Sequence, residues 1–286
     1  MVVTLPDAPA PAADVAYVAP MADADLIDFE RGTFTHDGKT RDVFRKGSGP
    51  AVLVIAEMPG ITPKVLAFAD RVVAAGFSVT LPHLFGVPGR DASSKVKGVR
   101  AVLTSMVPAC VSKEFVVFAT GRTSPVVDWL RALAKAEHER CGGPGVGAVG
   151  MCFTGGYALA MSTEPALLAP VLSQPSLPIG KKGAHGIDIS REDLDVVKGR
   201  CANEDLQVLG LRFKSDKFVP AARFQFLRDE LGDAFTCVEL EDADANPDAM
   251  IKPHSVLTEH FVDEPGSATH DALDQVLDLF RRKLLV

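Results

Sequence analysis

The sequence has few cysteines, and they are not arranged in the patterns in which cysteines usually serve structure. Its five cysteines lie far apart among 286 residues and include no C-x-x-C pair. An odd number at wide spacing fits neither a disulfide framework nor a structural zinc site. We therefore expect free thiols in a cytoplasmic protein, with no metal and no organic cofactor.

Basic runs and long apolar runs are also missing. The chain has 30 Lys and Arg residues against 37 Asp and Glu residues, a formal net charge of −7. This balance, without any basic and aromatic stripe, argues against a nucleic-acid partner. No apolar run approaches the roughly 20 residues of a membrane span, so we expect no membrane partner. Residues 1–20, rich in Ala, Pro and Asp, lack the features of a secretion signal and are predicted to be a flexible arm.

Hydrophobic residues make up 47% of the sequence, which is enough for a large core in a chain of this length. We predict one folded domain over residues 21–286. We expect a monomer or a small homo-oligomer, and the sequence does not decide between them.

Short apolar segments alternate with amphipathic ones along the chain. Asp37-Gly38 lies between two segments of mixed polarity and predicts an N-terminal β-hairpin. The purely apolar segment 51–55 is typical of a buried parallel strand covered on both faces. Further strands are predicted at 77–81, 146–150, 167–172, 206–213 and 235–240, which are mostly apolar.

Helix signals follow most of these segments. Thr62-Pro63 and Ser124-Pro125 each read as an N-cap and first helical residue, and Ser190 as a further N-cap. Apolar residues at helical spacing mark the others. The predicted helices run from about 62 to 75, 124 to 140, 157 to 161 and 269 to 284. A short polar helix is predicted to begin at Ser190, and another contains Phe224, Leu227 and Leu231 and ends before Gly232.

This alternation predicts an α/β fold with a mostly parallel central sheet and helices on both faces. Ligands of such sheets bind beyond the carboxyl ends of the strands. The polar or reactive residues expected there are Glu57, His83, Cys152, Ser173, Asp216 and His254. Residues 91–120 show no clear pattern, and a lid or an insertion could lie there.

The stretch Gly150-Met151-Cys152-Phe153-Thr154 lies between a predicted strand and a predicted helix. A nucleophile elbow places its reactive side chain on such a turn and needs small residues two positions away on each side. Gly150 meets this requirement. Thr154 meets it only in part, because the chain delays its glycines to the next two positions.

The order Cys152, Asp216, His254 is the nucleophile, acid, histidine order of α/β-hydrolases. Ordinary roles remain open for each residue. The thiol could be a small buried hydrophobic group and the carboxylate could cap a turn. The base could instead be His260, His83 or His185.

The sequence resembles the dienelactone hydrolases, α/β-hydrolases with cysteine in place of serine. The resemblance rests on four pieces and extends from about the hairpin to the final helix. The pieces are Ala56-Glu57-Met58-Pro59-Gly60, Gly150-Met151-Cys152-Phe153-Thr154-Gly155-Gly156, Ser215-Asp216-Lys217-Phe218-Val219-Pro220 and Pro253-His254-Ser255.

The resemblance implies roles for further residues. Glu57 would help to generate the thiolate, and the backbone N–H groups of Phe153 and Met58 would form the oxyanion hole. The founding enzymes of the family hold the substrate carboxylate with arginines in two loops. Here these loops instead contain Phe85 and Val87, and Val256 and Leu257, which are expected to offer an apolar wall to the substrate. Lys217 or Arg122 could still supply a positive charge.

Together these features predict a cysteine hydrolase that cleaves a small ester or lactone through an acyl-thioenzyme. Cys152 would be the nucleophile, His254 the base and Asp216 the residue that orients it. The alternative is a catalytically silent α/β-hydrolase scaffold that binds a ligand or partner, with Cys152 as a redox-sensitive thiol.

Overall fold

A computed structural model describes residues 26–90, 114–115, 121–249 and 251–285. The predicted arm at 1–20 and nearly all of the segment 91–120 lie outside these residues. Within them, no helix is both long enough and apolar enough to cross a bilayer.

The predicted hairpin is confirmed. Strands β1 (Glu30–His36) and β2 (Lys39–Lys46) pair antiparallel around a tight turn. Asp37 and Gly38 at the turn have φ of 48° and 71°, the left-handed backbone that a two-residue hairpin requires. The hairpin adds to the edge of the main sheet through antiparallel pairing of β2 with β4.

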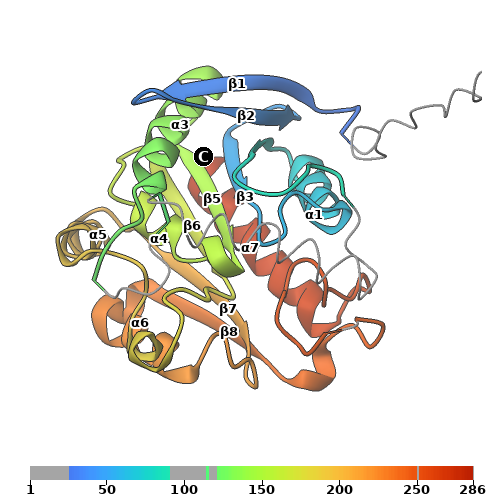
Figure 1. The fold of residues 1–286 in the computed structure, drawn as a ribbon, viewed down its shortest axis with the longest axis vertical. Helices are drawn as coiled ribbons and strands as arrows, with labels where there is room; N and C mark the ends of the chain where they lie inside the picture. Colours follow the sequence, from blue (N-terminus) through green and yellow to red (C-terminus); the bar gives the residue numbers. More distant parts are fainter. Residues whose placement is uncertain (1–25, 91–113, 116–120, 250, 286) are drawn as a thin grey trace, which may run out of the picture.

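The central sheet has eight strands in the order β1-β2-β4-β3-β5-β6-β7-β8, and the strands from β3 to β8 are mutually parallel (Figure 1). The predicted mostly parallel α/β-hydrolase sheet is therefore confirmed. Every residue of β3, β4, β5 and β7 is buried, as expected for apolar strands covered on both faces. The six parallel strands are β3 (Ala51–Ile55), β4 (Ser78–Pro82), β5 (Val146–Met151), β6 (Leu167–Ser173), β7 (Val208–Phe213) and β8 (Phe235–Leu240).

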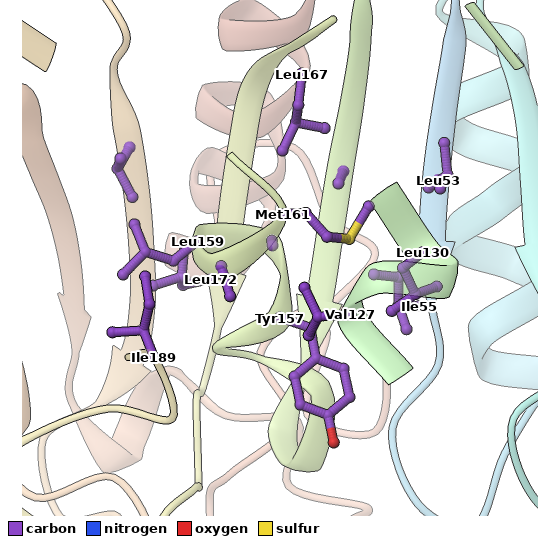
Figure 2. Packing of buried hydrophobic residues seen from close by; sticks show 14 of the residues in the cluster. Leu53, Ile55, Val127, Leu130, Tyr157, Leu159, Met161, Leu167, Leu172 and Ile189 are labelled. Atoms are coloured by element: carbon purple, nitrogen blue, oxygen red, sulfur yellow. The ribbon is translucent and has the colours of Figure 1, made fainter. Parts of the chain in front are cut away.

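Helices cover both faces of the sheet and separate the core into two layers. One layer contains residues of α3, α4, α5 and α6, and Figure 2 shows part of it around Tyr157 and Leu172. The other contains residues of α1 and α7. The helices are α1 (Pro63–Ala74), α3 (Val126–Cys141), α4 (Tyr157–Met161), α5 (Arg191–Asn203), α6 (Ala221–Leu231) and α7 (Ala268–Leu284).

Two of the predicted helix caps are confirmed and one is wrong. The hydroxyls of Thr62 and Ser190 accept from the backbone N–H groups of Val65 and Asp193 at the starts of α1 and α5. Ser124, in contrast, is fully buried, and α3 begins after Pro125 without a side-chain cap. The Ser124 side chain is buried in the interior and does not cap the helix. The helix therefore begins at Val126, one residue later than the Ser124-Pro125 pair predicts.

Candidate active site

Cys152 lies on a tight turn between β5 and α4. Its φ is +51°, in the left-handed region that non-glycine residues rarely adopt, and such strain is typical of a nucleophile elbow. Gly150 has to be glycine here, since a Cβ would lie 2.1 Å from the carbonyl oxygen of Thr154. The turn is therefore as tight as the sequence motif predicts.

Thr154 connects this turn to the neighbouring strand by hydrogen bonds. Its buried hydroxyl accepts from the N–H of Met151 at 2.9 Å and donates to the carbonyl of Ile55, at the end of β3, at 2.8 Å. A glycine at this position would leave both groups without these bonds. Thr154 thus has a structural use that the elbow pattern alone does not reveal.

The delayed glycines make room for the loop after β6. A Cβ on Gly155 would lie 2.4 Å from the Cα of Pro175, and one on Gly156 would lie 1.8 Å from Oδ1 of Asp188. These two positions need glycine because other segments pack directly against the start of α4.

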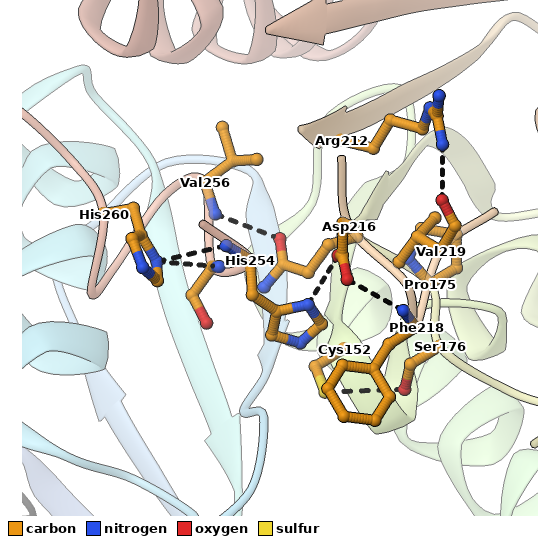
Figure 3. A network of polar contacts seen from close by, with 12 residues as sticks. Cys152, Pro175, Ser176, Arg212, Asp216, Phe218, Val219, His254, Val256 and His260 are labelled. Carbon is orange, nitrogen blue, oxygen red and sulfur yellow. Dashed lines mark hydrogen bonds and ion pairs between the residues drawn. The ribbon is translucent and has the colours of Figure 1, made fainter. Parts of the chain in front are cut away.

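His254 and Asp216 form a buried pair beside the thiol (Figure 3). Nδ1 of His254 lies 2.6 Å from Oδ2 of Asp216, whose Oδ1 accepts from the N–H of Phe218 at 2.9 Å. Asp216 is only 5% exposed. With Nδ1 donating to a carboxylate, Nε2 of the imidazole is left to exchange a proton with another group.

The electrostatics link this imidazole to Cys152. Burial lowers the pKa of His254, but the charge and hydrogen bond of Cys152, with those of Asp216, raise it well above its ordinary value. A ring nitrogen of His254 lies within 4.8 Å of the sulfur of Cys152. The protonated imidazole is favoured when the sulfur carries a negative charge.

Ser176 is a neighbour of the thiol that the sequence did not reveal. Its hydroxyl lies 3.4 Å from Sγ of Cys152, and its N–H donates to the carbonyl of the same cysteine at 2.9 Å. The loop that carries Ser176 follows the carboxyl end of β6. No motif marks the serine itself, so only the fold places it.

Arg223 stabilises that loop through hydrogen bonds to its backbone. Its guanidinium is 1% exposed and donates to backbone carbonyls, and burial lowers its pKa to about 10. The acceptors are Pro175, Pro178, Gly183, Gly186 and Phe218. Arg223 looks like an ordinary helix residue in the sequence, because its partners are backbone groups that carry no sequence signal.

Glu57 is buried at the end of β3, with 7% of its surface exposed. Its carboxylate accepts from Nε2 of Gln174 at 3.1 Å, from the hydroxyl of Ser255 at 2.6 Å and from the hydroxyl of Thr258. Among the described residues, no lysine or arginine forms an ion pair with it. Neutral donors therefore hold this carboxylate.

The other histidines have different positions. Nδ1 of His260 accepts from the N–H groups of His254 and Ser255, so Nε2 carries the proton and donates to the carbonyl of Ile251 at 3.1 Å. Burial lowers the pKa of His260. His83 contacts the carbonyl of Gly86, and His185 is exposed. The structure therefore brings His254, and none of these three, between the thiol and Asp216.

The backbone N–H groups expected to form the oxyanion hole follow the ends of two neighbouring strands. Met58 follows Glu57 beyond the end of β3, and Phe153 follows Cys152 beyond the end of β5. These two strands are paired in parallel, with Ile55 opposite Gly150. Met58 and Phe153 therefore lie beyond the same edge of the sheet. The oxyanion hole formed by their N–H groups stays a prediction.

The predicted apolar wall needs a correction. Val256 and Leu257 are 0% and 2% exposed and pack in the core layer of α1 and α7, so they do not line the site. These two apolar residues, which follow His254 in the chain, belong to the core instead. Val87 is 38% exposed, and Phe85 packs its ring 5.7 Å from that of Phe153.

Phe218 is an apolar neighbour that was not predicted. It is 63% exposed, and its ring lies 5.6 Å from that of His254. The two residues considered as sources of positive charge, Lys217 and Arg122, are both exposed. Ser173, expected at the strand ends, is buried and bonded to Gln174.

The sequence matches the family model described as "Dienelactone hydrolase family" over residues 42–283. The chain belongs to the dienelactone hydrolase family. It is therefore a hydrolase with the α/β-hydrolase fold, as the resemblance in its motifs implied. A search of the curated proteins finds no match to it.

Solved structures show the same fold at low sequence identity. A putative dienelactone hydrolase from Klebsiella pneumoniae is 16% identical, with a TM-score of 0.57, and the match covers 89% of this chain and 99% of that one. The dienelactone hydrolase-like promiscuous phosphotriesterase P91 from metagenomic libraries is 16% identical, with a TM-score of 0.51 and coverage of 90% and 98%. A cold-adapted esterase from an Arctic intertidal metagenomic library is also 16% identical, with a TM-score of 0.51 and coverage of 90% and 94%.

Proposed function

We propose that the chain hydrolyses small carboxylic esters or lactones through a covalent acyl-thioenzyme on Cys152. The observation that carries this proposal is the continuous arrangement of three groups. The Asp216 carboxylate bonds Nδ1 of His254, and a ring nitrogen of the same imidazole lies within 4.8 Å of the sulfur of Cys152, which is on a strained turn. Each group has the neighbour that its part in acyl transfer requires.

In the first half-reaction, Sγ of Cys152 attacks the carbonyl carbon of the ester. His254 takes the thiol proton at Nε2, while Asp216 holds the ring and stabilises its positive charge. The negative charge of the tetrahedral intermediate develops on the carbonyl oxygen. The N–H groups of Phe153 and Met58 would donate to that oxygen, a contribution of about 3–4 kcal/mol for a well-placed donor.

Collapse of this intermediate forms a thioester and breaks the bond to the leaving group, which takes the proton from His254. In the second half-reaction, the imidazole removes a proton from water as the water attacks the thioester carbon. The carboxylic acid then leaves and the thiol is regenerated. Ser176 lies close enough to the sulfur to donate a hydrogen bond to the thiolate in both halves.

The substrate class follows from the charges and apolar groups around the thiol. In the described part of the chain, no arginine or lysine bonds Cys152, Glu57 or His254. The nearby side chains Phe153 and Phe218 are apolar. Burying a carboxylate without a partner costs several kcal/mol, so neutral substrates fit better than anionic ones.

A panel of small esters and lactones tests the proposed function. The wild-type protein should hydrolyse at least one neutral member, and Cys152→Ala should lose activity by at least about a hundredfold while staying folded. No turnover by the wild type would leave the alternative of a silent scaffold, and equal turnover by the variant would show that Cys152 is not the nucleophile.

A further inference from the structure

The side chains of Glu57, Cys152 and His254 form a set of potential metal ligands. One ligand atom from each, a carboxylate oxygen, the sulfur and a ring nitrogen, all lie within 4.8 Å of one another. We propose that these three side chains bind Zn²⁺ as a reversible inhibitory ion. The ion would block the nucleophile, and its binding does not depend on the hydrolytic role proposed above.

The donor set and its spacing fit zinc. Zinc takes thiolate, imidazole and carboxylate ligands at about 2.0–2.3 Å, usually in a tetrahedron. Such distances separate the ligand atoms by roughly 3.3–3.6 Å. The three atoms therefore need to approach by no more than about 1.5 Å, which side-chain rotation at Cys152 and Glu57 can supply.

His254 is already oriented for a metal. Its Nδ1 is bonded to Asp216 at 2.6 Å, which fixes the ring and leaves Nε2 as the free nitrogen. A carboxylate on the far nitrogen of a metal-binding histidine is the usual arrangement in zinc proteins. The triad geometry thus also satisfies the requirements of a zinc ligand.

Glu57 is likewise held by groups that leave it able to bind a cation. A carboxylate has about four lone-pair sites, and three of them accept from Gln174, Ser255 and Thr258. These donors are neutral, and no described lysine or arginine forms an ion pair with the carboxylate. A divalent ion between Glu57 and Cys152 would place a positive charge beside it.

The binding step is balanced in atoms and charge. The pair of Cys152 and His254 loses one proton to solvent, which leaves a thiolate and an Nε2 without a proton. Both then bond to Zn²⁺ together with the Glu57 carboxylate, and the metal releases water molecules. Three protein ligands leave the fourth position to water. The soft sulfur ligand favours zinc over Mg²⁺ and Ca²⁺, which prefer oxygen ligands alone.

Cobalt(II) is the direct probe, because a bond from cobalt to a thiolate gives a charge-transfer absorption band whether or not the protein is active. The wild type should show this band at one equivalent of Co²⁺ and lose it when Zn²⁺ is added. Cys152→Ser should lack the band, and Cys201→Ser, which removes a thiol outside the site, should keep it. A band of full strength in Cys152→Ser would overturn the proposal.

Competition titrations with Zn²⁺ test the other two ligands. Glu57→Gln and His254→Asn should each weaken binding at least tenfold, with folding checked by circular dichroism. Where one variant fails to fold, the other still tests the ligand set. Unchanged affinity in a folded variant of either residue would overturn the three-ligand site. Inhibition of ester hydrolysis by Zn²⁺, reversed by a chelator, should follow the same affinity.

Discussion

The hydroxyl of Thr154 donates to the carbonyl of Ile55 at 2.8 Å, and this bond joins the turn of the nucleophile to the strand that leads to Glu57. The same oxygen accepts from the N–H of Met151. One buried side chain therefore adds a bond between the paired strand ends that lead to Cys152 and Glu57.

Replacing Thr154 by valine should destabilise the protein by about 1–3 kcal/mol, because a buried carbonyl and a buried N–H lose their partner. Thr154→Ser keeps the hydroxyl and is the matched control. Chemical denaturation measures the free energy of unfolding of both variants. Equal stability of the valine and serine variants would show that the hydroxyl bonds contribute nothing.

The elements and the order of the site residues were predictable from sequence, because apolar periodicity and turn residues are local signals. The hairpin at Asp37-Gly38 and the elbow at Cys152 are examples. Ser176 and Arg223 were not predictable, since their partners are backbone groups or atoms distant in the chain. Val256 and Leu257 were misread because an apolar residue near a site can face either the ligand or the core.

Replacing His254 by alanine should slow turnover by at least about a hundredfold, because the variant lacks the base that moves the thiol proton. His260 is the comparison, as its ring bonds only backbone groups. His260→Gln should affect stability more than the chemical step. Steady-state kinetics on folded variants decide this, and an active His254→Ala beside an inactive His260→Gln would transfer the role of base to His260.

Asp188 predicts an unusual pH dependence of stability. Both of its oxygens are buried without a hydrogen-bond partner, and burial raises its pKa to about 8. The unfolded chain has an aspartate pKa of about 3.9, so between these values the folded state holds a proton that the unfolded state has lost. The contribution of Asp188 to the free energy of unfolding is therefore most favourable below about pH 4 and decreases as the pH rises toward 8.

Asp188→Asn removes this penalty without changing the size of the side chain. The melting temperature of the variant should match that of the wild type near pH 4 and exceed it by several degrees at pH 8, because a pKa raised from about 3.9 to about 8 corresponds to a penalty on the order of 5 kcal/mol. Calorimetry at several pH values measures the difference. A variant less stable than the wild type at pH 8 would show that Asp188 is ionised and partnered in the folded protein.

Substrate charge should separate this protein from family members that bind a carboxylate with arginine. We expect a neutral methyl ester to be hydrolysed with a higher kcat/KM than the matching acid. The acid would lie near the carboxylate of Glu57, to which no described lysine or arginine is bonded. Preference for the acid by tenfold or more, about 1.4 kcal/mol, that weakens as salt is added would reveal a cationic subsite, with Lys217 and Arg122 as the first residues to replace.

The most direct test of the account is the capture of the acyl-thioenzyme. The protein is mixed with an activated ester, quenched in acid and examined by intact mass spectrometry and peptide mapping. We predict one acyl group on Cys152 in the wild type, more of it in His254→Ala if acylation still proceeds slowly, and none in Cys152→Ala. An acyl group on another residue, or full turnover by Cys152→Ala, would contradict the assignment of Cys152 as the nucleophile.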